Sequence, residues 1–173
     1  MKTLRNVLLT LLIVLGLAYA YGASLPRAHR ASASIALKQS PQAVYALISA
    51  VEDYPRWRTD VQAARLEAVP GALPQGVEEV EHWGAVRYEI TEQQAPARWV
   101  TRIVDQDQGW GGSWTYDIAA TADGASLRIT EDGFIDSPWF RLLATHVFGL
   151  DHPLKQYLKD VARHFGETAT PGA

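Results

Sequence analysis

The sequence predicts an α+β domain, in which a curved antiparallel β-sheet wraps around a long C-terminal α-helix. Two short helices are expected after the first strand, and one hydrophobic helix at the N-terminus. Three observations support this class. Segments of strand length in the middle of the chain alternate between apolar and polar residues. A helix start signal follows the first of them, and the last third of the chain carries apolar residues at helical spacing.

The N-terminal segment is basic and then apolar. Lys2 and Arg5 precede an uncharged run of 19 residues from Val7 to Leu25, close to the ~20 that a membrane-spanning helix needs. A cleaved signal peptide is the alternative, because residues 18–20 read Ala-Tyr-Ala, the pattern of a cleavage site. The run exceeds the ~7–15 residues of a usual signal-peptide core, which favours a membrane anchor over residues 1–30.

The placement of the domain follows from this segment. A short basic N-terminus stays on the cytoplasmic side by default, so we expect a single-pass membrane protein whose soluble domain is extracytoplasmic (periplasmic). Residues 7–25 would contact the membrane, with Tyr19 and Tyr21 at the level of the lipid headgroups. In this interpretation the segment is not part of the fold.

The domain itself is expected over residues 31–167, followed by a flexible tail at 168–173. Residues 31–37 alternate as a strand, and Ser40 and Pro41 then provide an N-cap and a first helical residue. Further strands are predicted by runs bounded by turn residues, at 61–69, 77–83, 85–91, 98–104, 113–119 and 125–130.

The alternation within the strands assigns their two faces. One face is charged, with Arg87, Glu89, Arg98, Arg102 and Asp117. The other face is apolar or aromatic, with Val86, Tyr88, Ile90, Trp99, Thr101, Ile103, Trp114, Tyr116 and Ile118. One solvated and one covered face is typical of an antiparallel sheet. A covered face so rich in tryptophan and tyrosine suits a cavity as well as a dry core.

The C-terminal part of the chain is expected to cover the apolar face of the sheet with a helix. Ser137 and Pro138 start a helix, and Gly149 to Pro153 predict a kink or break within it. Its apolar stripe consists of Leu143, Val147, Leu154, Leu158, Val161 and Phe165.

Composition excludes several classes of function. The net charge of −3 gives no basic surface for nucleic acid, and the absence of cysteine excludes disulfides and thiol catalysis. The five histidines include no pair at i,i+4 spacing and no HExxH motif. We therefore predict no metal, no cofactor and no nucleic-acid partner. The oligomeric state is not determined by the sequence.

The order of these segments resembles a known family. The segments are SPQAVYALISAVEDYPRWRTDV, GGSWTYDI, LRITEDGFIDSPWFRLLATHVFG and YLKDVARHFGE. Together they resemble the SRPBCC superfamily, the START-like group of polyketide cyclase/dehydrase and lipid transport proteins, over residues 32–167. The resemblance implies a helix-grip fold with a hydrophobic cavity between sheet and C-terminal helix. It does not imply one function, because members of this group bind, carry or convert different molecules.

The candidate cavity residues are mainly aromatic. They are Trp57, Trp83, Tyr88, Trp99, Trp114, Tyr116 and His146. Trp57 follows the Tyr54-Pro55 helix end, and it either plugs the core or forms a wall of the cavity mouth. The inward direction of Trp83 depends on the strand register, which the adjacent Gly84 can shift.

The acidic residues divide into two groups. Glu131 continues the inward phase of its strand, but Asp132-Gly133 predicts that the strand bends or ends there. Glu78, Glu79 and Glu81 are interpreted as a solvated strand face.

These features favour a membrane-anchored binding or carrier domain for a hydrophobic or amphipathic, lipid-like small molecule. One alternative is a cyclase or hydratase that uses Glu131, His146 or a cavity tyrosine as its acid–base group. The other is a protein–protein interaction module. A binding role is favoured over an enzyme, since no acid–base pair is evident from spacing, and no catalytic residue is assigned.

Overall fold

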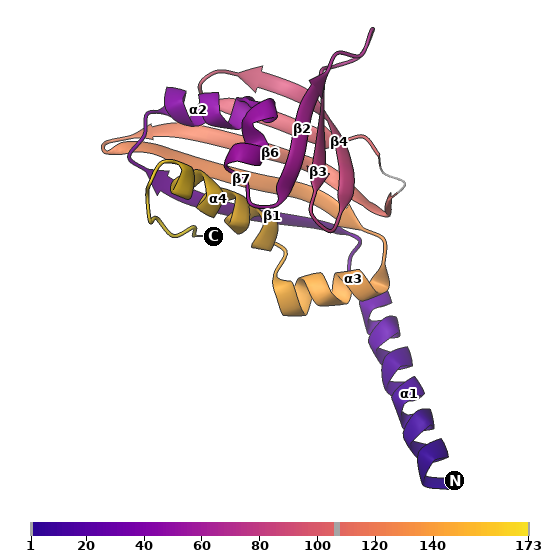
Figure 1. Ribbon diagram of the computed structural model, residues 1–173. Coiled ribbons are helices and arrows are strands. Elements are labelled where there is room, and N and C mark those ends of the chain that lie inside the picture. The colour runs from indigo at the N-terminus through magenta and orange to yellow at the C-terminus, as the bar shows by residue number, and fades with distance from the viewer. Residues whose placement is uncertain (1, 106–107, 173) are drawn as a thin grey trace.

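A computed structural model describes residues 2–105 and 108–172 and contains a seven-stranded antiparallel sheet (Figure 1). The strand order is β1-β7-β6-β5-β4-β3-β2. The strands are β1 (Ala28–Leu37), β2 (Val61–Glu67), β3 (Gln75–Val80), β4 (Gly84–Gln94), β5 (Arg98–Ile103), β6 (Trp110–Thr121) and β7 (Gly124–Ile135). The helices are α1 (Lys2–Ser24), α2 (Pro41–Ser49), η1 (Val51–Arg56), α3 (Pro138–Leu143), η3 (Ala144–Phe148) and α4 (His152–His164). The predicted α+β class and the curved antiparallel sheet are confirmed.

The register confirms the predicted faces of the central strands. Trp99 lies opposite Tyr116, and Thr101 lies opposite Trp114, so these four side chains share one face of the sheet. On the other face Arg98 forms an ion pair with Asp117, and Arg102 forms one with Glu89. The last strand is longer than expected, because β7 continues through Asp132 and Gly133 to Ile135, paired with β6 throughout.

Helices α2, η1 and α4 cover the inner face of the sheet and form the core with it (Figure 1). The fully buried side chains of this core include Val44, Ile48, Leu127, Leu154 and Leu158. Both predicted helix caps are present. Ser40 Oγ accepts from the backbone N–H of Ala43 at 3.2 Å, and Ser137 Oγ from that of Phe140 at 3.3 Å.

The C-terminal helical region is divided, as Gly149 and Pro153 predicted. Helix α3 passes into η3, a π-helical turn, and the chain then turns at Gly149, whose φ is 85°, before α4 begins. The break separates the predicted apolar stripe into two parts. Leu154 and Leu158 are buried in the core, whereas Leu143 and Val147 precede the break and are exposed.

Helix α1 projects away from the sheet, but its last turn packs against α3 (Figure 1). A methyl group at Gly22 would overlap the carbonyl group of Pro138, and Arg141 Nη1 donates to the carbonyl oxygen of Leu25 at 2.7 Å. The expectation that this segment is not part of the fold was therefore wrong for its C-terminal end. Helix α1 is the one helix in the described chain that is long and apolar enough to span a membrane, a test that signal sequences also pass.

Candidate functional site

A cavity of about 250 Å³ lies between the sheet and the helical region around α3 and the start of α4. Side chains from β3, β4, β5, β6 and β7 form one side, and α3, η3 and the α4 start form the other. The volume is just below the ~300–1,000 Å³ usual for ligand pockets. The cavity therefore suits a small molecule, or one segment of a longer one.

One part of the cavity wall is charged. Arg58, which follows η1, donates from Nη1 to Glu78 Oε2 at 2.7 Å. Its other nitrogens form a bidentate pair with Asp60, at 3.1 and 2.8 Å. Burial alone lowers the pKa of Arg58, but the carboxylates of Glu78 and Asp60 outweigh it and raise the pKa above the ordinary arginine value. The guanidinium therefore remains charged.

Glu78 does not lie on a solvated face, which corrects the expectation from the sequence. Its side chain is 7% exposed and lines the cavity, since Glu78 lies opposite Val86, another cavity residue. A carboxylate is tolerated in this position because Arg58, itself 10% exposed, compensates its charge. Glu79 and Glu81 are not buried.

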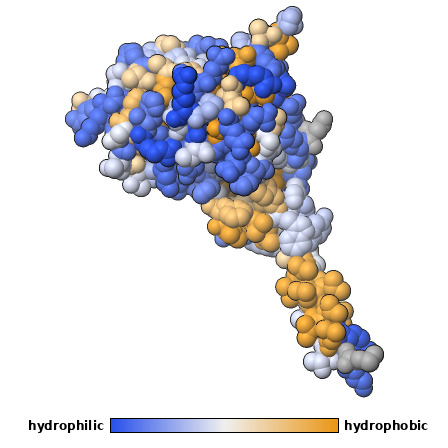
Figure 2. Space-filling model, in the orientation of Figure 1, coloured by the Kyte–Doolittle hydropathy of each residue, from blue (hydrophilic) through white to orange (hydrophobic). Residues whose placement is uncertain are grey.

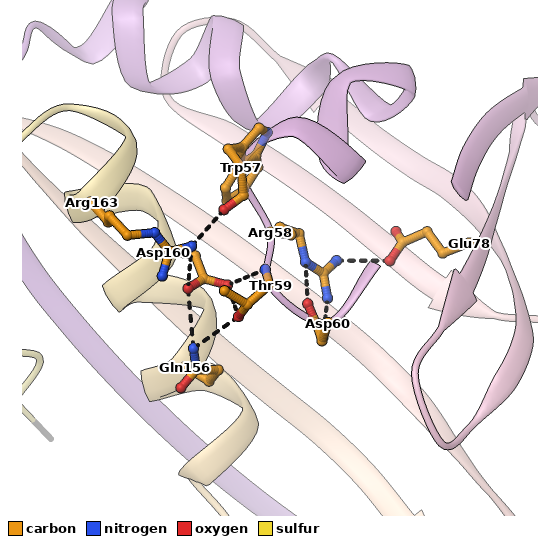
Figure 3. A network of polar contacts seen from close by, with 8 residues as sticks. All are labelled: Trp57, Arg58, Thr59, Asp60, Glu78, Gln156, Asp160 and Arg163. Atoms are coloured by element: carbon orange, nitrogen blue, oxygen red, sulfur yellow. Dashed lines mark hydrogen bonds and ion pairs between the residues drawn. The ribbon is translucent and has the colours of Figure 1, made fainter. Parts of the chain in front are cut away.

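The loop that carries Arg58 is fixed to α4 by a second polar network (Figure 3). The fully buried carboxylate of Asp160 accepts from the backbone N–H and the hydroxyl of Thr59, both at 2.9 Å. Gln156 and Arg163 donate to the other oxygen of Asp160, and Arg163 also donates to the carbonyl oxygen of Trp57. This network holds residues 57–60 in place, so that Arg58 points away from α4 toward Glu78 (Figure 3).

Four buried tyrosines surround the charged group. This tyrosine cluster consists of Tyr54, Tyr88, Tyr116 and Tyr157. Burial raises the pKa of all four above the ordinary value of about 10. The guanidinium of Arg58 also lies 5.4 Å from the ring centre of Tyr54 and 5.0 Å from that of Tyr157.

Tyr88 owes its position to a glycine on the neighbouring strand. Gly76 lies opposite Tyr88, and a side chain at Gly76 would overlap the tyrosine ring. The buried Tyr88 hydroxyl makes no hydrogen bond of good geometry within residues 2–105 and 108–172. The Glu78 carboxylate is nevertheless close enough to add to the effect of burial in raising the pKa of Tyr88. A bound molecule can therefore hydrogen-bond with this hydroxyl in the wall of the cavity, with Glu78 as a neighbouring acceptor.

A second pair of ionisable groups lies elsewhere on the wall. Glu131 points into the cavity, and its Oε1 is 3.8 Å from Nε2 of His29 on β1. The inward phase predicted for Glu131 is present because β7 does not end at Asp132 and Gly133. His29 was not assigned to the cavity from the sequence.

The structure places four of the seven candidate residues on the cavity wall. They are Trp83, Tyr88, Trp114 and Tyr116. Trp83 is 48% exposed and lies at the β3–β4 turn, between His82 and Gly84, which both have positive φ. It belongs to the rim of the cavity.

The other three candidates do not line the cavity. Trp57 is buried in the core between Tyr54 and Tyr157, which is the plug arrangement. Trp99 shares the face of Tyr116 but lies under α2, in edge contact with Tyr45, where the sheet is covered directly. His146 lies on the outer side of η3, and its Nε2 is 3.0 Å from the Tyr21 hydroxyl of α1.

The rim contains two further aromatic residues, which were not assigned to it from the sequence. The ring centre of Trp83 is 5.2 Å from that of Trp110 and 5.5 Å from that of Phe140. Trp110 opens β6 and Phe140 comes from α3, so three separate segments form this aromatic rim. Helical periodicity alone could have indicated Phe140, but not which side of α3 faces the cavity.

No group of three or more metal-ligating side chains occurs within the described residues. The cavity is thus mainly apolar, with the ion pair of Arg58 and Glu78 and the Tyr88 hydroxyl in its wall and an aromatic rim at its edge. It defines a class of α+β proteins that can enclose an apolar or amphipathic small molecule.

Comparison with known proteins identifies the family within this class. It belongs to the polyketide cyclase/dehydrase and lipid transport family, whose pattern matches residues 28–166. The predicted resemblance is confirmed over nearly the whole domain. No curated protein is similar enough in sequence to be matched.

Several solved structures share the fold at low sequence identity. The di-domain ARO/CYC protein StfQ of the steffimycin biosynthetic pathway has a TM-score of 0.64 at 12% identity, covering 80% of this chain. Only 52% of StfQ is matched, so the chain spans about half its length. Norcoclaurine synthase from Thalictrum flavum has a TM-score of 0.63 at 8% identity, with 86% of this chain and 91% of that chain covered.

A third relative is a START superfamily protein from Mycobacterium smegmatis. Its TM-score is 0.56 at 16% identity, with 80% of this chain and 99% of that chain covered. At these identities the likeness establishes the fold alone.

Proposed function

We propose that the protein is a membrane-anchored binding or carrier domain for a lipid-like, amphipathic small molecule held in the cavity. The observation that carries this proposal is the cavity itself, whose wall is mainly apolar and aromatic, with its charged side chains gathered in two places, around Arg58 and at Glu131. Helix α1 has 23 residues, with a mean hydropathy of 2.0 over its most apolar 18 residues, and serves as the anchor in this proposal.

The charges of the cavity limit the polar group of the ligand. Among the described lining residues, the carboxylates of Asp60, Glu78 and Glu131 outnumber the guanidinium of Arg58. An anionic headgroup would be repelled, whereas an uncharged hydroxyl or a cationic group would be accepted. The hydroxyl of Tyr88 can hydrogen-bond with such a group.

Photolabelling tests this proposal. The full-length protein is reconstituted in vesicles containing a medium-chain alcohol with a diazirine, irradiated, and mapped by peptide mass spectrometry. We expect adducts on β4 and β6, near Tyr88 and Trp114, in addition to adducts on α1 from the surrounding lipid.

The matched control is Thr101→Trp, which fills the cavity from β5. It should lose the adducts on β4 and β6 and keep those on α1. Adducts on the two strands that are equally strong in the variant would contradict the proposed site.

An acid–base enzyme is a second candidate, favoured by Glu131 and His29 on the same cavity wall. A carboxylate and an imidazole 3.8 Å apart can exchange a proton with a bound molecule. If Glu131→Gln abolished turnover of a substrate while photolabelling persisted, the enzyme would replace the carrier.

A further inference from the structure

An exposed apolar surface lies at the base of the domain, beside α1. It consists of Trp139, Leu143, Val147 and Phe148, and we call it the α3 surface. Val147 is 64% and Phe148 is 55% exposed. Figure 2 shows hydrophobic atoms gathered at the base of the domain and continuing onto α1. A contiguous apolar surface of this kind indicates a contact with another apolar body.

The α3 surface is held at a fixed position relative to α1. Gly22 brings the two helices into close contact at Pro138, and Arg141 donates a hydrogen bond to the carbonyl oxygen of Leu25. The ring centres of Tyr19 and Trp139 are 5.9 Å apart, and those of Tyr21 and His146 are 5.6 Å apart. These contacts join α3 and η3 to the last turns of α1 only.

This position determines the depth of the surface in a membrane. A helix of 23 residues is about 35 Å long at 1.5 Å per residue, slightly more than the ~30 Å hydrocarbon layer. When α1 spans the bilayer, its last turns reach the headgroups, where tyrosine and tryptophan are enriched. Tyr19, Tyr21 and Trp139 then lie in that layer, and the contacts of α3 and η3 with α1 bring the rest of the α3 surface close to the same depth.

The opposite side of the same segment lines the cavity. Phe140 and Ala144 face inward, while Leu143 and Val147 face outward. A helix with apolar residues on both sides is normally covered on both. The cavity accounts for the inner side, and a bilayer beside α1 accounts for the outer one.

We propose that the α3 surface docks in the interfacial layer of the lipid bilayer, as a second membrane contact besides α1. Residues 138–149 then form a single wall between the bilayer and the cavity. The π-helical turn η3 and Gly149 lie within this wall, where the helix is irregular. A lipid-like ligand can thus pass between bilayer and cavity by displacement of one short segment. This inference rests on the proposed function, because it takes α1 to be a membrane anchor.

Single cysteines provide the test, since the natural chain contains none. Full-length Val147→Cys is labelled with an environment-sensitive fluorophore and reconstituted in vesicles of phosphatidylcholine and phosphatidylglycerol. Thr121→Cys is the matched control, because this exposed residue ends β6 at the opposite end from Trp110 and the cavity rim. Val14→Cys reports on the anchor. Quenching is measured with spin-labelled lipids and, separately, with iodide in the aqueous phase.

We expect lipid quenching at least ~3-fold stronger at position 147 than at position 121, and iodide quenching in the reverse order. If iodide quenches positions 147 and 121 equally while lipid quenches position 14, α1 is a membrane anchor but the docking proposal is wrong. Protection of position 147 from both quenchers means that a protein covers it, which also overturns the proposal. If lipid quenches neither position 14 nor position 147, the anchor and the docking both fail.

Discussion

The buried ion pair between Arg58 and Glu78 gives the sharpest prediction about the cavity wall. Arg58→Met retains much of the side-chain volume but removes the charge. The Glu78 carboxylate, only 7% exposed, is then left buried without its partner. Breaking a buried pair in this way typically costs about 3–5 kcal/mol. The loss of the ion pair with Asp60 adds little to this cost, because the Asp60 side chain is 40% exposed and water can solvate it.

The measurement is urea unfolding of the full-length protein in a mild detergent, at neutral pH, followed by near-ultraviolet circular dichroism. We expect the free energy of unfolding to fall by about 3–5 kcal/mol in Arg58→Met. The control is the double variant Arg58→Met/Glu78→Leu, which removes both charges and should recover most of the loss, to within about 1–2 kcal/mol of the natural protein.

Two results would contradict the coupling of Arg58 and Glu78 in a buried ion pair. The first is a loss below about 1 kcal/mol in Arg58→Met, the range of a solvated surface pair. The second is a double variant that costs as much as its two single substitutions together, since additive effects would mean that the two side chains are not coupled.

Three further predictions concern Trp57 in the core, the polar network of Asp160 and the tyrosine cluster. Trp57→Ala should cost about 3–5 kcal/mol of unfolding free energy and leave photolabelling of the folded protein unchanged. Weaker labelling would indicate that Trp57 lines the cavity. Asp160→Ala should cost about 2–3 kcal/mol by leaving the Thr59 donors unpaired, whereas Lys159→Ala on exposed α4 surface should cost little. For the tyrosine cluster, a raised folded-state pKa means that stability is complete below pH ~10 and is lost above it. The loss should approach about 1.4 kcal/mol per pH unit for each tyrosine. Of the seven tyrosines, absorbance at alkaline pH should show no more than the three outside the cluster ionised before unfolding, and ionisation of more than three in the folded protein would disprove the burial of the cluster.

Much of the fold could be predicted because strand alternation is a local signal. Tyr88, Trp114 and Tyr116 were assigned to the covered face from their spacing alone, and the register confirms that face. The break before α4 was equally local, since it depends on Gly149 and Pro153.

The cavity itself depends on contacts between distant segments. Arg58 and Glu78 are 20 residues apart in the chain, and only the pairing of β3 with β4 turns Glu78 inward. Trp99 has the correct phase but lies under α2, because the helices cover one part of the sheet directly and leave the cavity in another.

The position of α1 was unpredictable for a similar reason. Its apolar run indicated a membrane segment, but the close approach of Gly22 to Pro138 joins residues more than 100 positions apart. His146 was assigned to the cavity for its place on an apolar helix, whereas it contacts Tyr21 instead. Helical periodicity gives the stripe of a helix but not the partner that the stripe meets.

Native mass spectrometry of the detergent-extracted, full-length protein is the most direct test of ligand binding in the cavity, because it detects a bound molecule by its mass, whatever its chemical identity. We expect a co-purified, lipid-like mass on the natural protein, released at higher collision energy, and its loss in Thr101→Trp, where the cavity is filled. Equal occupancy of both proteins would contradict binding in the cavity, and an unliganded natural protein that also takes up no added medium-chain alcohol would contradict the carrier function.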